Sequence, residues 1–361
     1  MKAAVLRDLG QPMAIEEVQI AKPGPREVLV RIVASGLCHS DLHVLEGDIA
    51  YPLPAILGHE PAGIVEQVGA DVRTVKPGDH VVVCLTFNCG HCEQCHGGNA
   101  HRCREPDTMR GAGEPPRLSQ GGVAVDPFMA IGSFAEMILV HESGCVAIRK
   151  DMPLDRACLI GCGVTTGFGA VTRSANVRAG ESVMVIGCGG VGLAAINGAY
   201  VAGAGRIIAV DRLPSKLAMA KTFGATDTID ATAGDIVEQV MALTGGRGVD
   251  HAIEAIGRKE TIEAAFNGLA KGGLATVVGA TRADTLVQLP ALAFLREKRI
   301  QGSMMGGVRL AIDIPHYVEL YMQGRLKLDE LVSQRLSLAE INRGFDDLRK
   351  GEVARSVITF A

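Results

Sequence analysis

At 361 residues the chain is longer than a single hydrophobic core usually supports, so its length predicts two domains. Hydrophobic residues make up 47% and charged residues 21%, an ordinary globular composition, and a net charge of −4 argues against a surface that binds nucleic acid. The sequence shows neither a leader-like apolar stretch nor an uncharged apolar run of membrane-spanning length, so we expect a cytoplasmic protein without membrane segments whose ten cysteines stay reduced.

The first 35 residues alternate short apolar runs with turns, which is typical of β-structure. One predicted strand places apolar side chains at every second position on a single face: Val28, Val30, Ile32 and Ala34. This strand leads into Cys38, which we therefore expect at a strand end, where a rigid scaffold can hold its side chain in place.

Thiol, imidazole and carboxylate side chains gather between residues 36 and 60. Cys38 and His59 are candidate zinc ligands, and a catalytic zinc takes three protein ligands and leaves one position open. The best third candidate is Cys162, which lies in a Gly-rich segment just before a nucleotide-binding pattern. Alternatively, Cys38 is a small buried apolar residue and His59 an ordinary core histidine.

The residues after Cys38 are expected to form a helical turn, which places Ser40 and His43 near one another. The serine hydroxyl could take the proton of an alcohol, and the histidine could pass it toward solvent. In the alternative, Ser40 only caps the helix and His43 faces water. Asp41 and Glu60 could accept a hydrogen bond from a metal-bound histidine or could form ordinary ion pairs.

A second group of thiols follows in the CxxCxxCx₇C pattern: Cys89, Cys92, Cys95 and Cys103. Four cysteines at this spacing predict a closed tetrahedral zinc site, which stabilises the fold and has no vacancy for a substrate. An iron–sulfur centre is the alternative, because ferredoxin-like motifs share the CxxCxxC opening. Those motifs continue with a different third gap and usually a proline.

Residues 104–133 form a long connection rich in Gly and Pro, and loops of that length are commonly functional. Phe128 and Met129, near its end, could reach a substrate pocket or could pack on their own domain. Short strands are expected to resume after the loop, and a helix to begin near Pro153.

From Val164 onward, buried strands alternate with helices, as in a doubly wound parallel sheet. Gly187, Gly189 and Gly192 form GxGxxG between a predicted strand and a predicted helix. Glycines at this spacing let the backbone approach a pyrophosphate at the helix N-terminus. The segment therefore predicts a dinucleotide-binding site.

Asp211 ends the next predicted strand, where an acid binds the adenosine ribose hydroxyls. Because its charge would repel a 2′-phosphate, Asp211 favours NAD over NADP. Arg212 beside it could instead partner such a phosphate. Lys216 could also reach the ribose or remain a solvated charge.

These motifs, in this order, resemble the zinc-dependent medium-chain alcohol dehydrogenases over essentially the whole chain. The shared features are the GHE segment, the four-cysteine group, the GCG stretch and the GxGGVG loop. The resemblance implies an α/β protein with a β-rich GroES-like catalytic domain (1–163 and 305–361) and a Rossmann NAD-binding domain (164–304). It also implies NAD, two zinc ions per chain, a small alcohol or aldehyde as substrate, and a homodimer.

The resemblance further assigns residues by motif position. The catalytic zinc falls to Cys38, His59 and Cys162, the structural zinc to Cys89, Cys92, Cys95 and Cys103, the proton relay to Ser40 and His43, and the acid beside the metal to Glu60. The coenzyme contacts are His39, Thr166, Gly187, Gly189, Gly190, Val191, Gly192, Asp211, Arg212, Lys216, Val278 and Arg355. The implied substrate pocket contains Leu85, Phe128, Met129 and Ala280.

The resulting hypothesis is reversible NAD- and zinc-dependent oxidation of medium or aromatic primary alcohols to aldehydes, since the pocket residues are mostly apolar. One alternative is a thiol-dependent formaldehyde dehydrogenase, in which Arg110 and Arg117 could hold the carboxylates of the thiol adduct. The other is a non-catalytic NAD-binding protein stabilised by a structural zinc. His39 stands where many relatives have an arginine that binds pyrophosphate, which predicts weaker, pH-dependent NADH binding.

Overall fold

The computed structural model contains two compact units. The residues that it describes are 1–104, 108–111, 113–351 and 353–360. The first unit comprises Met1–Cys162, Arg309–Gly324 and Leu328–Ala361, and the second comprises Gly163–Val308 and Arg325–Lys327. The α/β class expected from the sequence is confirmed, with a β-rich first unit and a parallel sheet in the second.

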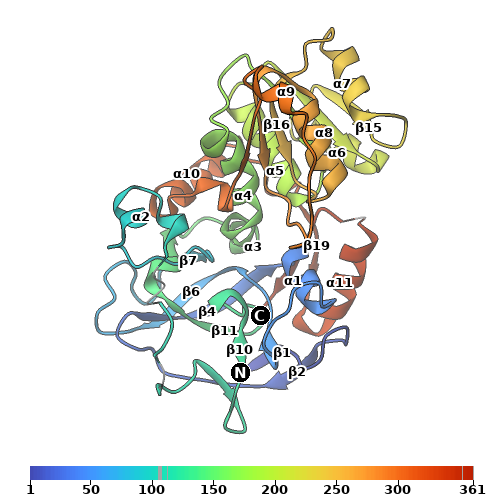
Figure 1. The fold of residues 1–361 in the computed structure, drawn as a ribbon. Helices are drawn as coiled ribbons and strands as arrows, with labels where there is room; N and C mark the ends of the chain where they lie inside the picture. The colour runs from blue at the N-terminus through green and yellow to red at the C-terminus, as the bar shows by residue number, and fades with distance from the viewer. Residues whose placement is uncertain (105–107, 112, 352, 361) are drawn as a thin grey trace. The chain divides into compact units, whose positions relative to one another are not determined.

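The first unit is built on a seven-stranded sheet with the order β12-β7-β6-β4-β20-β19, and β11 pairs with β4 (Figure 1). Its strands are β4 (Glu27–Gly36), β6 (Glu60–Val68), β7 (His80–Val83), β11 (Met137–His141), β12 (Cys145–Ile148), β19 (Val332–Leu336) and β20 (Arg355–Thr359). The alternating apolar face predicted for residues 28–34 is confirmed, because its four side chains are at most 1% exposed.

Two smaller sheets complete the β-structure of the first unit. One has the order β10-β5-β1-β2, and its strands are β1 (Lys2–Leu6), β2 (Ala14–Glu17), β5 (Ala55–Ile56) and β10 (Asp126–Pro127). The other consists of β3 (Gln19–Ile20), β8 (Leu118–Gln120) and β9 (Val123–Ala124). The expected long connection 104–133 therefore includes three short strands, and its residues 105–107 and 112 lie outside the described part.

Helices of the first unit are short except near the C-terminus. They are α1 (His39–Leu45), α2 (Glu93–His96), α3 (Leu154–Ala157), α10 (Leu310–Met322) and α11 (Ile341–Lys350). The core beside α11 includes Phe134 and Phe345, whose rings meet edge to face with centroids 5.8 Å apart. Among the described residues, no helix has the length and apolar character needed to cross a bilayer.

The second unit is a six-stranded sheet with the order β15-β14-β13-β16-β17-β18, in which every neighbouring pair is parallel. Its strands are β13 (Ser182–Ile186), β14 (Arg206–Asp211), β15 (Asp227–Asp230), β16 (Val249–Glu254), β17 (Leu269–Val277) and β18 (Arg299–Gly302). The chain runs outward from β13 to β15 and then returns to β16. A doubly wound sheet binds its ligand at such a reversal.

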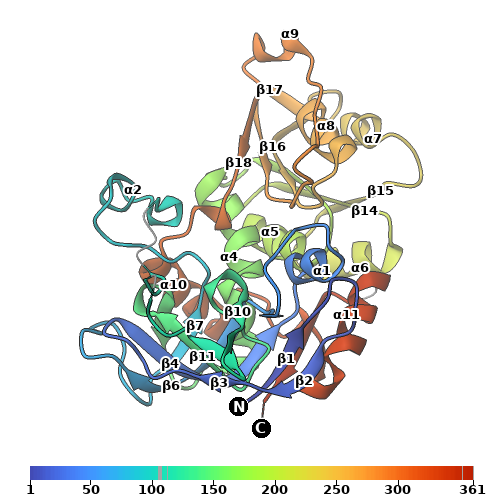
Figure 2. The ribbon, with the colours of Figure 1, turned by 60° about the horizontal axis from the view of Figure 1, so that its bottom comes forward.

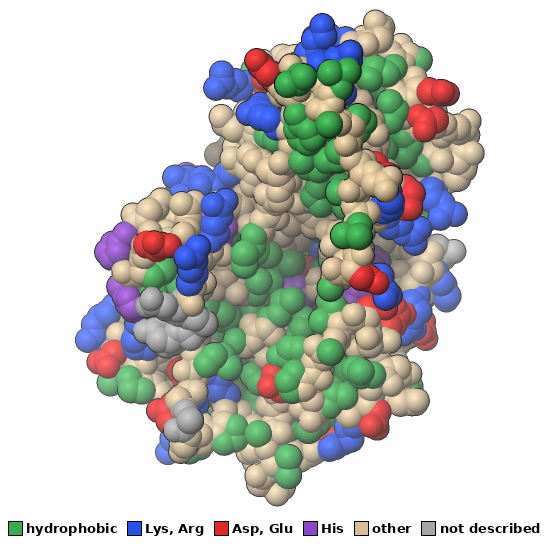
Figure 3. All heavy atoms as spheres, in the orientation of Figure 1, with side chains coloured by type: hydrophobic (Ala, Val, Ile, Leu, Met, Phe, Trp, Pro, Cys, Tyr) green, Lys and Arg blue, Asp and Glu red, His purple; other side chains and the backbone are tan. Residues whose placement is uncertain are grey.

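The helices of this unit are α4 (Gly163–Gly169), α5 (Gly190–Val201), α6 (Pro214–Thr222), α7 (Ile236–Leu243), α8 (Lys259–Asn267) and α9 (Ala291–Phe294). In Figure 2, α9 lies at the outer end of the unit beyond β17. Figure 3 shows hydrophobic side chains gathered on the surface around α9. The strongly exposed ones include Leu286 and Leu295.

Three strands of the first unit bring distant residues to one place. Gly36 at the end of β4 is the register partner of Glu60, which opens β6, and of Val357 in β20. Arg355 opens β20. A Cβ at Gly36 would collide with the Glu60 carboxylate, so glycine at this position leaves room for the acid.

Candidate metal centres and coenzyme site

Four buried side chains with metal-binding atoms converge in the first unit. Their donor atoms all lie within 4.8 Å of one another, and we call them the buried cluster: Cys38, His59, Glu60 and Cys162. Cys38 directly precedes α1, His59 and Glu60 stand at the start of β6, and Cys162 follows a short 3₁₀ turn. The structure therefore brings together the three residues expected to bind a catalytic zinc.

Asp41 fixes the orientation of this cluster from behind. Its Oδ1 lies 3.1 Å from His59 Nδ1 and accepts from the Gly58 amide at 2.9 Å, while its Oδ2 accepts from the Cys38 amide at 3.2 Å. The carboxylate therefore holds the Nδ1–H form of His59 and leaves Nε2 as the basic nitrogen. That Nε2 atom is buried and has no hydrogen-bond partner among the described residues.

The donor set suits zinc, because two thiols and one imidazole are among its usual ligands. A hydrogen bond from Cys162 and the positive charges of His59 and Arg355 hold the pKa of Cys38 well below its usual value. Its hydrogen bond with Cys38, together with burial, raises the pKa of Cys162. One thiolate is thus favoured by the protein alone, and a divalent cation would favour the second.

Glu60 is the fourth member of the cluster, and its partner is Arg355. Arg355 Nη2 lies 3.2 Å from Glu60 Oε1, and Arg355 Nη1 donates to the Leu37 carbonyl at 3.0 Å. Both side chains are almost fully buried. Burial raises the pKa of Glu60 to about 7 against the opposing charge of Arg355. The expected acid therefore lies beside the metal-binding atoms, and Arg355 balances its charge.

The residues of the predicted proton relay lie on α1, one helical turn apart. Cys38 Sγ lies 3.8 Å from Ser40 Oγ, so this hydroxyl lies next to the buried cluster. His43 is one third exposed, and its Nδ1 lies 3.1 Å from Asp48 Oδ2. The order from the cluster to the surface is thus Ser40, His43 and Asp48. The catalytic roles remain predictions.

The cysteine lobe, which consists of Cys89, Cys92, Cys95 and Cys103, forms the second candidate metal centre of the first unit. Four sulfur–sulfur distances in it are 3.9 Å (Cys89–Cys95), 3.6 Å (Cys92–Cys95), 3.9 Å (Cys92–Cys103) and 3.5 Å (Cys89–Cys103). A tetrahedral site with Zn–S bonds of about 2.3 Å places its sulfurs about 3.8 Å apart. The lobe therefore fits one ion, whereas the thiolates of a multi-iron cluster bind different irons.

Backbone amides stabilise the thiolate form in this lobe. The amide of Cys92 donates to the Cys89 sulfur, and the amide of Cys89 donates to the Cys103 sulfur, each at 3.4 Å. A hydrogen bond from the Cys95 backbone is the main factor that lowers the pKa of Cys92 to about 6. Thiolates are the form of cysteine that binds metal.

The Gly-rich loop of the second unit joins β13 to α5. Gly187 has φ +97°, and a Cβ at Gly192 would collide with the Gly187 carbonyl, so the turn requires glycine at both positions. Gly189 precedes the first residue of α5, Gly190, and has no side chain to cap the helix. Together with Val191, the loop leaves helix amides available to a phosphate.

Asp211 ends β14 beside this loop. Its Oδ2 accepts from the Cys188 amide at 2.8 Å, and its Oδ1 accepts from the amides of Arg212 and Leu213 at 2.7 and 3.1 Å. These bonds hold the carboxylate next to the Gly-rich turn, as expected for an acid that binds a ribose. Arg212 is exposed, and Lys216 is partly exposed on α6.

The other predicted coenzyme contacts are distributed over both units. His39 is exposed at the first position of α1, whereas Arg355 is buried beside Glu60. In the second unit, the Thr166 hydroxyl contacts Met305 Sδ at 3.4 Å, and the Val278 amide donates to the Glu254 carbonyl at 2.8 Å. The assignment of these residues to the coenzyme remains a prediction.

The predicted pocket residues also belong to both units. Leu85, Phe128 and Met129 lie in the first unit, and Ala280 lies in the second. Phe128 is 3% exposed, and its ring meets that of His59 edge to face with centroids 5.7 Å apart. Phe128 therefore lies beside the buried cluster, as expected for a residue near the substrate. Ala280 is exposed in its own unit.

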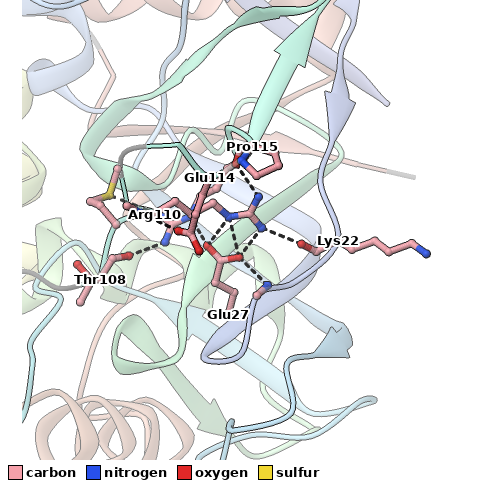
Figure 4. Close-up of polar contacts among 10 residues, drawn as sticks. Lys22, Glu27, Thr108, Arg110, Glu114 and Pro115 are labelled. Atoms are coloured by element: carbon pink, nitrogen blue, oxygen red, sulfur yellow. Dashed lines mark hydrogen bonds and ion pairs between the residues drawn. The ribbon is translucent and has the colours of Figure 1, made fainter.

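Arg110 and Arg117 do not form the free basic patch that the thiol-adduct hypothesis requires. Arg110 Nη2 and Arg117 Nε bind the Glu27 carboxylate at 2.6 and 2.7 Å, and the Gly24 amide donates to it at 2.8 Å (Figure 4). Glu27 is buried at the start of β4. The two arginines instead fasten the loop to the sheet, because the buried carboxylate needs their charge.

Sequence reasoning missed several residues that organise these sites. Glu27 and Tyr51 carried no motif, and their partners are remote in the chain. Glu254 was also missed. Its Oε1 accepts from the amides of Ile256 and Gly257 at 2.9 and 2.8 Å, and it thereby holds the turn that follows β16. An acid at the carboxyl end of a buried parallel strand was the available signal for Glu254.

Comparison with known proteins connects both units to described families. The zinc-binding dehydrogenase model matches residues 190–322, and the alcohol dehydrogenase GroES-like domain model matches residues 24–150. The probable S-(hydroxymethyl)glutathione dehydrogenase 1 of Schizosaccharomyces pombe is 40% identical over 99% of this chain and 96% of its own length.

Two solved structures cover the chain from end to end. The benzyl alcohol dehydrogenase from Acinetobacter calcoaceticus is 36% identical with a TM-score of 0.94, covering 100% of this chain and 99% of its own. An alcohol dehydrogenase zinc-binding domain protein from Burkholderia ambifaria is 38% identical with a TM-score of 0.95, covering 100% of this chain and 98% of its own.

Proposed function

Because this chain belongs to the zinc-dependent medium-chain dehydrogenase family, we propose that it oxidises primary alcohols reversibly to aldehydes with NAD as the hydride acceptor. The observation that carries the proposal is the buried cluster, in which two thiols and one imidazole nitrogen converge and Asp41 orients the imidazole. A protein that only bound NAD would need no such buried donor set.

Two zinc ions per chain are proposed, one in the buried cluster and one in the cysteine lobe. Cys38, His59 and Cys162 would hold the first, which leaves a fourth position for the alcohol. When bound, this zinc would polarise the alcohol hydroxyl and lower its pKa, and NAD would accept the hydride. Glu60, whose charge Arg355 balances, stands beside these ligands as a further carboxylate that could approach the metal.

The proton of the alcohol would leave along α1. The Ser40 hydroxyl adjoins the cluster, so it is the group suited to accept that proton first. His43, one turn further and partly exposed, would receive it and release it to solvent. Asp48 accepts from His43 Nδ1 and so would leave Nε2 available as the base.

The coenzyme would bind in the second unit at the loop of Gly187, Gly189 and Gly192. Amides at the start of α5 suit the pyrophosphate, and Asp211 suits the two hydroxyls of the adenosine ribose. Since this carboxylate would repel a 2′-phosphate, we propose NAD rather than NADP. His39, Thr166, Val278 and Arg355 are proposed as further contacts by analogy with the family.

The substrate is proposed to be a medium or aromatic primary alcohol. Leu85, Phe128, Met129 and Ala280 offer apolar surface, and the similar Acinetobacter protein is a benzyl alcohol dehydrogenase. The relative in Schizosaccharomyces pombe keeps a second candidate open, the S-hydroxymethyl adduct of glutathione. Against that candidate, Arg110 and Arg117 are both occupied by Glu27.

NADH formation from NAD, followed by absorbance, tests the proposal with ethanol, benzyl alcohol and longer primary alcohols. Parallel assays contain formaldehyde with and without glutathione. We expect turnover of alcohols without thiol and the highest kcat/KM with benzyl alcohol or a medium-chain alcohol. Turnover of formaldehyde only with glutathione would establish the adduct instead, and no turnover of either substrate would favour the non-catalytic alternative.

A homodimer is proposed as well, with the second copy covering the apolar surface around α9. Leu286 and Leu295 are 81% and 83% exposed there, and β18 is the outermost strand of its sheet. Exposed apolar side chains next to a sheet edge favour pairing with another chain. Light scattering should give a dimer for wild type and a monomer for Leu295→Asp. Val123→Asp, at an exposed apolar position of β9, is the control and should remain dimeric.

A cytoplasmic location is proposed because the six cysteines expected to bind zinc need a reducing environment to stay thiols. Measuring the protein in a cytoplasmic fraction of its cell would test this directly.

A further inference from the structure

Tyr51 makes a partly buried polar contact that no sequence motif predicted. It lies in the connection between α1 and β5, and its hydroxyl donates to Asp126 Oδ1 at 2.6 Å and reaches the Pro127 carbonyl at 3.3 Å. Burial and the Asp126 carboxylate raise the pKa of Tyr51, so the phenol keeps its proton and remains the donor. The contact joins positions 75 residues apart in the chain.

The ring of Tyr51 begins a row of aromatic contacts that ends at the buried cluster. Tyr51 meets Phe128 edge to face, with centroids 5.0 Å apart and planes at 79°. Phe128 in turn meets His59 at 5.7 Å and 78°. Edge-to-face pairs at these distances attract one another and favour one relative orientation of the rings. Phe128 thus stands between Tyr51 and a candidate metal ligand.

The backbone around Phe128 needs such support. Met129 and Ala130 have φ values of 52° and 60°, so two consecutive residues with side chains occupy the left-handed region. Each residue in that region costs about 1 to 2 kcal/mol unless its surroundings impose it. The turn is fastened by the Asp126 amide, which donates to the Pro54 carbonyl at 2.9 Å, and by the Gly132 amide, which donates to the Phe128 carbonyl at 3.1 Å.

His59 is therefore held in two independent ways. Asp41 binds its Nδ1 atom, and Phe128 contacts its ring. Asp41 explains the direction of the ligand nitrogen but not the shape of the space next to the ring. That shape depends on Phe128, whose ring also contacts the ring of Tyr51.

We propose that Tyr51 is a positioning residue that, anchored on Asp126, holds Phe128 against His59 and so shapes the alcohol site for bulky substrates. The inference rests on the proposed function, because it names a determinant of substrate choice at the same site. Tyr51 itself performs no chemistry. Without its hydroxyl, the turn would relax, and the apolar wall beside His59 would no longer have one fixed position.

The test compares Tyr51→Phe, which keeps the ring and removes the hydroxyl, with Asp126→Asn, which weakens the same bond from its other side. Tyr321→Phe is the matched control. Tyr321 lies on α10, and its hydroxyl also donates to a carboxylate, that of Asp329. The first readout is kcat/KM for benzyl alcohol and for ethanol. The second uses cobalt-substituted protein without coenzyme, in which visible absorption reports the binding of imidazole and of 4-phenylimidazole.

Tyr51→Phe and Asp126→Asn are each expected to lower kcat/KM for benzyl alcohol by about three- to tenfold, the range for the loss of one hydrogen bond, and to change that for ethanol much less. The affinity for 4-phenylimidazole should fall by a similar factor, and that for imidazole should not. Tyr321→Phe should alter neither the ratio of kcat/KM for benzyl alcohol to that for ethanol nor the ratio of the affinities for 4-phenylimidazole and imidazole.

Equal effects on both alcohols, or none, would overturn the role of Tyr51. The proposed function can fail separately, because a wild-type protein that oxidises neither alcohol contradicts it. In that case the two imidazole affinities still decide whether Tyr51 shapes the space beside His59, because they require no turnover. If Tyr51→Phe does not fold, the same two ratios in Asp126→Asn decide the question.

Discussion

The two groups of metal-binding side chains are assembled in opposite ways. The cysteine lobe draws all four thiols from residues 89–103, and its supporting hydrogen bonds come from its own backbone. The buried cluster draws on residues 38, 59–60 and 162, and its support comes from Asp41, Arg355 and Phe128. One site is nearly self-contained, and the other depends on distant parts of the first unit.

This difference fits the two roles proposed for these sites. Four thiolates close a tetrahedral site, so the lobe can stabilise the chain but has no position for a reactant. The buried cluster offers three sulfur and nitrogen ligands together with Glu60, whose charge is balanced by Arg355. A zinc held by only three of these ligands would keep a fourth position for a substrate. Substitutions in the cluster should mainly change turnover, and substitutions in the lobe should mainly change stability.

The largest effect is expected for Cys162→Ser. Loss of one thiolate should release the zinc of the buried cluster and lower NAD-dependent alcohol oxidation by more than about 100-fold, beyond the range for residues outside the ligand shell. Metal analysis should find one zinc per chain, and the midpoint of thermal unfolding should stay close to that of wild type. A variant with one zinc and an unchanged rate would contradict the assignment of Cys162.

Cys103→Ser should produce the converse result. The lobe would lose a ligand, and the free energy that its zinc adds to folding would fall by several kcal/mol. We expect a thermal midpoint at least about 5 °C lower, measured by circular dichroism. The rate per folded chain should remain near that of wild type, and a selective loss of rate without a change in midpoint would reverse the two roles.

Asp41→Asn would weaken the support of the buried cluster without removing a ligand. The amide no longer offers His59 a charged acceptor, so we expect a 10- to 100-fold loss of zinc affinity or turnover. Competition with a chelator measures the affinity, and excess zinc should restore part of the rate. Wild-type affinity combined with a wild-type rate would show that Asp41 only shapes the backbone.

Glu27→Gln tests whether the loop that follows the lobe can be loosened without affecting either metal centre. Burial raises the pKa of Glu27, but the hydrogen bonds from Arg110 and Arg117 lower it by more, so the pKa lies below its usual value. We expect the substitution to lower the free energy of unfolding by about 2 kcal/mol near neutral pH, with two zinc ions retained.

The pH dependence of that difference has a definite sign. A depressed carboxyl pKa contributes stability above the unfolded pKa, and this contribution is lost as the pH falls through the folded value. The gap in thermal midpoint between wild type and Glu27→Gln should therefore be full at pH 6 and should narrow on acidification below about pH 4. A gap that stays constant with pH would show that the ion pairs contribute nothing.

Sequence motifs predicted those sites whose residues lie close together in the chain. The spacing of Cys89 to Cys103 and the glycines at 187–192 each lie within one turn or loop, so the sequence carried both the residues and their arrangement. The comparisons confirmed the fold class and the membership of the zinc-dependent medium-chain dehydrogenase family. The roles of individual site residues remain predictions that the substitutions above test.

Long-range contacts could not be predicted in this way. Glu27 meets Arg110 across 83 positions, and this contact occupies an arginine that the thiol-adduct alternative needs for its substrate. Spacing alone does not reveal which acid is buried beside an arginine. The Glu60–Arg355 pair arises because three separate strands meet in register, and Tyr51 reaches Asp126 from the connection before β5, a strand that pairs with β10. Such contacts depend on sheet topology, which a single sequence specifies only weakly.

Gradual removal of zinc from the wild-type protein tests the central claim most directly. A chelator is added over time, and zinc per chain, the rate of NAD reduction by an alcohol, and the thermal midpoint are measured on each sample. We expect the rate to follow the loss of one zinc equivalent and the thermal midpoint to follow the loss of the other. Rate and midpoint falling together with the same equivalent would contradict the separation of a catalytic and a structural site.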